Sequence, residues 1–178
     1  YTIRLRTTDN LGCSFDTPNT IFIKNVNDAP TGLSLSNNQI DENLLANTTI
    51  GSLTAIDTDS NEVFTYSFVA GAGGSDNGAF NLSGNTLRAN TALDFETKST
   101  YSVRLQVADR ANNLFVDTFK ITVNDINDAP TDVVINSDSV LENLPINTVV
   151  ATLSTTDQDA GQNFAYSFDN VPGNNNAD

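Results

Sequence analysis

The sequence predicts an all-β protein built from β-sandwich domains of about 100 residues in tandem. The first observation is self-similarity, because residues 1–78 align with residues 101–178 without a gap. A unit of this size corresponds to an independent domain, whereas solenoid repeats span about 20 to 50 residues. The second observation is a hydrophobic period of two, and the third is a cluster of Gly, Asn, Asp or Ser about every ten residues, which is typical of a sandwich.

Alternating apolar residues predict the strands of one unit. In Tyr101, Val103, Leu105 and Val107 the apolar side chains alternate with polar ones, which indicates a half-buried strand. The same alternation, or a short apolar run between turn residues, predicts the other strands over residues 33–35, 48–55, 64–68, 79–82, 85–88 and 119–123. No segment shows a sustained period of 3.6 residues, so we expect no long helix.

Repeated Asn-Asp-Ala-Pro segments at 27–30 and 127–130 mark the boundaries between units. They predict the C-terminal part of a first repeat over residues 1–28, a complete repeat over 29–128 and the N-terminal half of a third over 129–178. Both ends of the sequence then cut through a domain, so we expect an internal segment of a longer chain.

Composition excludes several function classes. Asp and Glu number 22 against 8 Lys and Arg, a formal charge of −14, whereas a nucleic-acid binder needs a basic face. The chain has no His and one Cys, which excludes a Ser-His-Asp or Cys-His site and a zinc cluster of those residues. No apolar stretch is long enough to span a bilayer, so we expect no membrane contact by this segment. The scarcity of Cys suits an extracellular bacterial protein.

Acidic residues recur at strand ends and at the unit boundaries. A single acidic residue usually serves solubility alone, but recurrence at equivalent places favours a ligand role. The recurring motifs are Glu42-Asn43 and Glu142-Asn143, Asp57-Thr58-Asp59 and Asp157-Gln158-Asp159, Asp9 and Asp109, and the junctions 25–28 and 125–128. A further acidic motif, Leu93-Asp94-Phe95-Glu96, lies in the middle of the complete unit. Carboxylate, amide and carbonyl oxygens are the donors that Ca²⁺ prefers.

With these motifs in this order, the chain resembles tandem cadherin repeats, especially those of large bacterial surface proteins. The resemblance implies tandem Greek-key β-sandwiches of the cadherin or immunoglobulin-like kind, with Ca²⁺ held where the acidic motifs of one repeat meet those of the next. Two positions depart from the family pattern. Ala29 and Ala129 replace the final junction Asn, and Asn25 replaces the leading junction Asp.

The resemblance implies calcium ligands at two junctions. Those of the second junction are Glu42, Asp94, Glu96, Asp125, Asn127 and Asp128, with Asp157 and Asp159 from the third repeat. Those of the first junction are Asn27, Asp28, Asp57, Asp59 and Asp109. Asn25 lacks the carboxylate that Asp125 offers, so we expect the first junction to hold calcium less tightly.

The function that the resemblance implies is structural and adhesive. We expect a calcium-rigidified stalk segment of an extracellular, cell-surface adhesin-like protein, with neighbouring repeats as partners and another surface protein or a glycan as further candidates. The alternative is a calcium-dependent carbohydrate-binding module, which the absence of Trp and the core parity of most Phe and Tyr disfavour. Asp94 and Glu96 could form a glycosidase pair, but nothing else indicates a sugar cleft, so we expect no enzyme.

Overall fold

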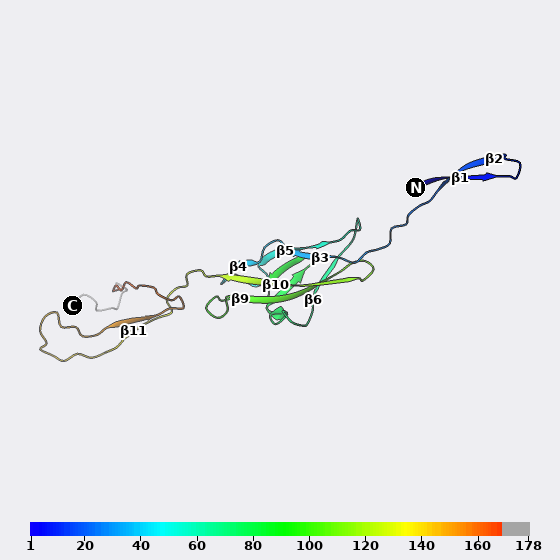
Figure 1. The fold of residues 1–178 in the computed structure, drawn as a ribbon. Coiled ribbons are helices and arrows are strands. Elements are labelled where there is room, and N and C mark those ends of the chain that lie inside the picture. The colour runs from blue at the N-terminus through cyan, green and yellow to red at the C-terminus, as the bar shows by residue number, and fades with distance from the viewer. Residues whose placement is uncertain (169–178) are drawn as a thin grey trace.

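The computed structural model describes residues 1–168, which form a central sandwich flanked by two hairpins (Figure 1). One hairpin pairs β1 (Thr2–Thr8) with β2 (Ser14–Thr20), and the other pairs β11 (Asp132–Ile135) with β12 (Leu153–Thr156). The all-β prediction is confirmed. The expected third repeat extends to residue 178, and its part from 169 on lies outside the described residues. Residues 1–168 contain no helix with the length and apolar character that crossing a bilayer requires.

Two four-stranded sheets make the central sandwich. The order of one sheet is β4 (Gln39–Asp41), β10 (Leu114–Asn124), β9 (Thr100–Ala108) and β6 (Thr65–Phe68). The order of the other is β3 (Gly32–Leu35), β5 (Thr49–Ile56), β8 (Thr86–Ala89) and β7 (Phe80–Ser83), and the short 3₁₀ helix η1 (Asn77–Ala79) leads into β7. Strands β3 to β7 alternate between the sheets, which gives the predicted Greek-key connections.

The core lies between the two sheets. Val103, Leu105 and Val107 are fully buried, as their alternation predicts, and β10 adds Ile121 and Val123. The remaining buried apolar residues are Leu33, Ile40, Ile50, Leu53, Phe80, Leu87, Ala89 and Leu93. Burying each large side chain contributes about 1.5 to 3 kcal/mol, so this core supplies a rigid frame for the loops at both ends of the sandwich.

Strand β4 brings two acidic segments to one pole of the sandwich. It is too short to show an alternating pattern, so the sequence does not predict it. β4 runs parallel to β10, with Ile40 beside Val123 and Asp41 beside Asn124. Parallel strands end at the same edge, so the segments that begin at Glu42 and Asp125 meet there.

Backbone geometry recurs from one repeat to the next. β11 pairs with β12 in the register Asp132 to Thr156, just as β3 pairs with β5 from Gly32 to Ile56. The left-handed backbone conformations recur as well, at Asn43 and Asn143, at Asn47 and Asn147, and at Asn61 and Gly161. Asn and Gly adopt a positive φ more readily than other residues. The division of the chain into repeats at residues 28 and 128 remains a prediction, but loops at equivalent positions of the second and third repeats have the same backbone geometry.

Candidate metal centre

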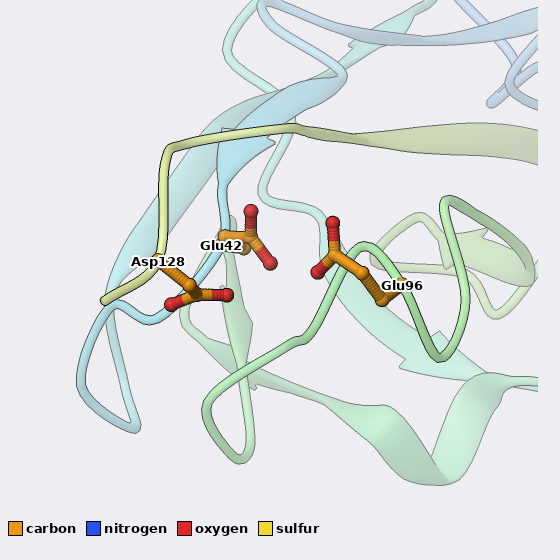
Figure 2. Close-up of side chains that lie close together, drawn as sticks. All are labelled: Glu42, Glu96 and Asp128. Carbon is orange, nitrogen blue, oxygen red and sulfur yellow. The ribbon is translucent and has the colours of Figure 1, made fainter. Parts of the chain in front are cut away.

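Five carboxylates from four segments converge where β4 and β10 end. Glu42, Glu96 and Asp128 place carboxylate oxygens within 4.8 Å of one another, and Figure 2 shows these groups turned toward each other. Glu96, Asp125 and Asp159 form a second such group. Glu96 belongs to both groups, so together they make one acidic cluster, here called the second-junction cluster.

Glu42 positions the other members of this cluster. Its side chain is only 2% exposed. Oε2 accepts a hydrogen bond from the backbone N–H of Phe95 (2.8 Å), and Oε1 accepts one from the backbone N–H of Ile126 (2.7 Å). One carboxylate therefore ties the loop that carries Glu96 to the segment that carries Asp125 and Asp128.

Asp94 lies on the same loop, but its carboxylate is turned to its own chain. It accepts hydrogen bonds from the backbone N–H and the hydroxyl of Thr97, each at 2.9 Å. The backbone bond is the main reason that the pKa of Asp94 lies below its ordinary value. In this structure Asp94 shapes the loop of Glu96 and is not among the converging oxygens of the second-junction cluster.

Asn127 and Asp157 lie beside the cluster. The Asn127 amide nitrogen donates to the carbonyl oxygen of Asp128 (2.6 Å), and its Oδ1 accepts a hydrogen bond from Gln162 (2.8 Å). Asp157 Oδ1 accepts one from the backbone N–H of Asp159 (3.0 Å). Its other oxygen, Oδ2, is buried and has no hydrogen-bond partner among the described residues.

At the opposite pole, where β5 and β9 end and β3 begins, the structure brings the five predicted first-junction residues together. Asn27 donates to the carboxylate of Asp109 (2.7 Å). The backbone N–H of Asp28 donates to Asp59 Oδ2 (2.6 Å), and that of Asp59 donates to Asp57 Oδ1 (2.8 Å). Asp57 Oδ2 is buried and has no partner among residues 1–168, as at its counterpart Asp157.

Asp109 is buried at this pole. Its burial opposes ionisation, but hydrogen bonds from the side chains of Asn27 and Asn113 and from backbone N–H groups outweigh that effect and lower its pKa. A carboxylate held ionised at this position suits a cation site.

The second-junction cluster is electrostatically unfavourable without a cation. Desolvation raises the pKa of Glu96, and the charges of Glu42, Asp125 and Asp159 raise it further. Desolvation and neighbouring carboxylates raise the pKa of Asp125 in the same way. The ion pairs within residues 1–168 involve Asp16 and Asp76, so no Lys or Arg in the described chain pairs with the cluster.

The residues at both junctions fit calcium. All the side-chain donors are oxygens, and Ca²⁺ takes six to eight of them. Asp57 Oδ2 and Asp157 Oδ2 are buried acceptors that a hydrogen bond or a cation must satisfy, because an unpaired buried polar group is costly. A cation at each junction would satisfy these oxygens and neutralise the neighbouring charge.

Three side chains at the second junction escaped prediction as contributors. Asn43 donates to Asp128 Oδ1 (2.8 Å), and Gln158 donates to Asp128 Oδ2 (3.2 Å). Gln162 donates to Asp159 Oδ2 (2.9 Å) as well as to Asn127. Asn43 recurs as Asn143, which was an available signal, whereas Gln158 and Gln162 lie opposite different residue types in the preceding repeat.

Comparison with known proteins decides the family. A family model described as Cadherin domain matches residues 36–124, half of the chain. The chain belongs to the cadherin family. Cadherin domains are extracellular cell-adhesion repeats, and calcium binding is typical of them. Members of this family are adhesion domains and not enzymes, which agrees with the expectation that this chain is no enzyme.

Human protocadherins resemble this cadherin chain over different spans. Protocadherin gamma-A11 from Homo sapiens is 40% identical over 74 residues, which are 40% of this chain and 8% of that protein. Protocadherin Fat 4 from Homo sapiens is 33% identical over 190 residues, covering 98% of this chain and 4% of that protein. The crystal structure of human protocadherin-24 EC1-2, form II, is 28% identical with a TM-score of 0.55 and covers 69% of this chain and 56% of that one. The chain thus spans less than a tenth of the length of these two curated relatives.

The aromatic residues of the central cadherin domain do not favour the carbohydrate-binding alternative. Phe80 is buried and packs edge-on against Tyr101, with 5.6 Å between ring centroids. The others pack, partly buried, against the core: Phe64, Tyr66, Phe68, Phe95, Phe115 and Phe119. A platform for stacking sugar rings needs aromatic faces that are free, so the packing of these rings against the core does not favour that alternative.

Proposed function

We propose that this cadherin chain is a calcium-rigidified stalk segment of an adhesin-like surface protein, in which junction carboxylates clamp consecutive repeats. The second-junction cluster carries the proposal, because it draws Glu42 and Glu96 from the second repeat, Asp125 and Asp128 from the junction, and Asp159 from the third repeat into one group. Bound Ca²⁺ supplies positive charge and a flexible shell of oxygen ligands. The five residues of the cluster come from segments that are far apart in sequence and place their carboxylate oxygens close together.

Each residue has a distinct part in this clamp. Glu42 accepts hydrogen bonds from the backbone N–H groups of Phe95 and Ile126, and so it orients both the loop that carries Glu96 and the second junction. Glu96 bridges the two carboxylate groups. Asp159 is held against the junction by the backbone N–H of Asp128 (2.7 Å), so the third repeat is already in contact with the second. Neutralising the mutual repulsion would then stiffen a contact that exists.

The expected partners are the neighbouring repeats of the same chain, and another surface protein or a glycan would be bound elsewhere in the parent. The bacterial surface-protein type is supported by the scarcity of Cys, since the chain has a single one. The resemblance to human protocadherins supports an adhesive role without supporting that source.

A calcium titration of the chain, read by calorimetry and thermal unfolding, tests the proposal. Extracellular modules bind Ca²⁺ with dissociation constants of about 0.1 to 1 mM, and each site at 100 times its constant adds about 2.7 kcal/mol of stability. Glu96→Ala should remove most of this gain, and Asp94→Ala a smaller part through its loop. Asp117→Asn, on the exposed face of β10, is the matched control and should behave as wild type. A melting temperature that is the same with and without millimolar calcium would refute the proposal.

A further inference from the structure

Position 62 in the first-junction loop is structurally equivalent to position 162 in the second. Each follows a residue with left-handed backbone, Asn61 (φ 63°) or Gly161 (φ 77°). The two loops carry the same internal hydrogen bond, from the backbone N–H of the second Asp to Oδ1 of the first. Both side chains are half-buried. The two side chains therefore start from the same place, but one is Glu and the other is Gln.

Gln162 acts as a donor that satisfies two oxygens. Its Nε2 donates to Asn127 Oδ1 (2.8 Å) and to Asp159 Oδ2 (2.9 Å). At the first junction the equivalent oxygens belong to Asn27 and Asp59. At the second junction the Gln162 amide therefore satisfies both oxygens by hydrogen bonding, without an ion.

Glu62 cannot act in this way, because an ionised carboxylate only accepts hydrogen bonds. Its Oε2 is buried and has no hydrogen-bond partner among the described residues. Glu62 thus places an acceptor where Gln162 places a donor. Asp59 Oδ2 still accepts the hydrogen bond from the backbone N–H of Asp28 (2.6 Å), but position 62 donates none to it or to Asn27 Oδ1. Among ordinary solutes a cation is what satisfies such a group, and a divalent one suits carboxylates and carbonyls.

We propose that Glu62 is an additional calcium ligand of the first junction, which supplies the negative charge that Asn25 removes there. This inference rests on the proposed calcium function. It also revises the expected inequality of the two junctions. The first junction lacks the carboxylate of Asp125 but gains one at position 62, whereas the second has Asp125 and a neutral Gln162. The two junctions thus carry this negative charge at different positions, at Glu62 in the first and at Asp125 in the second.

The test is a calcium titration of the full chain followed by ¹H–¹⁵N NMR, which reads the two junctions separately. The backbone amides of Asp28 and Asp128 report the first and second junction, since each donates to the second Asp of the adjacent loop. In Glu62→Gln we expect the titration midpoint at Asp28 to rise on the order of tenfold, with Asp128 unchanged. In the reciprocal variant Gln162→Glu we expect the midpoint at Asp128 to fall, with Asp28 unchanged.

Metal-free stability separates a ligand from a packing residue. With a chelator present, Glu62→Gln should melt at or above the wild-type temperature, because the amide can make the bonds that Gln162 makes. A side chain that only packs would give the same calcium midpoint in the variant. If the Asp28 amide responds to calcium in the wild type, and its midpoint in Glu62→Gln lies within twofold of the wild-type midpoint, then Glu62 is not a ligand. That result would leave the proposed calcium function intact. If neither amide of the wild type responds to calcium, the proposed function fails and this inference fails with it.

Discussion

Replacing Glu42 by Gln should weaken the central sandwich even when no calcium is present. The Glu42 carboxylate is nearly fully buried and accepts two backbone hydrogen bonds, from Phe95 and Ile126. Gln has the same shape but offers one oxygen acceptor, so one of these N–H groups would face an amide nitrogen. The change therefore removes a charged acceptor and leaves a buried donor unpaired.

Two opposing effects set the magnitude. Hydrogen bonds to a charged group contribute about 1.5 to 3 kcal/mol each, and an unpaired buried donor costs about 1 to 3 kcal/mol. In the other direction, removing the charge relieves repulsion from neighbouring carboxylates, about 1 to 4 kcal/mol for a pair about 4 Å apart at effective dielectrics of 80 to 20. The hydrogen-bond loss is larger at the centre of these ranges, so we expect Glu42→Gln to lower the free energy of unfolding by about 2 kcal/mol.

Thermal unfolding in a chelator, followed by circular dichroism, measures this effect. A loss of about 2 kcal/mol should lower the melting temperature of a domain of this size by at least about 8 °C. Glu142→Gln is the matched control, because Glu142 holds the equivalent sequence position and is exposed in this chain, so it should melt as wild type does. If Glu42→Gln melts within about 2 °C of wild type, the anchoring role of Glu42 is wrong.

Three further predictions concern charge, backbone space and pH. In a chain that carries a complete first repeat, Asn25→Asp should tighten calcium binding at the first junction and Asp125→Asn should weaken it at the second, each on the order of tenfold by calorimetry, and unchanged affinity in both would contradict the charge argument. A Cβ at Gly51 would lie 2.5 Å from the backbone oxygen of Asn37, so Gly51→Ala should cost about 2 kcal/mol or more in urea unfolding, while Gly78→Ala, which meets nothing within 4 Å, should not. Hydrogen bonds from Lys98 and then from the backbone N–H of Ser102 lower the pKa of Asp76 from its ordinary 3.8. Its stabilisation is therefore complete above that pH and is lost as pH falls through the lowered pKa, so an Asp76→Asn variant should differ from wild type at pH 7 and converge with it in acid.

Much of the fold could be predicted because its signals are local. Alternation in Val103, Leu105 and Val107 predicts which faces are buried, and the structure confirms it. Strand β4 shows no such pattern, since it is defined by pairing with β10 across a long sequence separation. Its existence follows from tertiary contact and not from its three residues.

The candidate site divides in the same manner. The resemblance of the acidic motifs to those of cadherin repeats implied which acids would converge, and Glu42, Glu96, Asp125, Asp128 and Asp159 do so. What recurrence cannot indicate is orientation: Asp94 turns to Thr97 because its own loop offers two donors. Nor does a substitution between repeats attract notice until the contacts of Gln162 show what Glu62 lacks.

Small-angle X-ray scattering of the chain, in millimolar calcium and in chelator, tests the central claim most directly. The hydrophobic core of the central sandwich lies between its two sheets, whereas the junction is a short segment lined by like charges, so calcium should change stiffness between repeats more than the fold within them. The account predicts a longer maximum dimension in calcium than in chelator, with far-ultraviolet circular dichroism β-like in both. An unchanged maximum dimension would contradict the account.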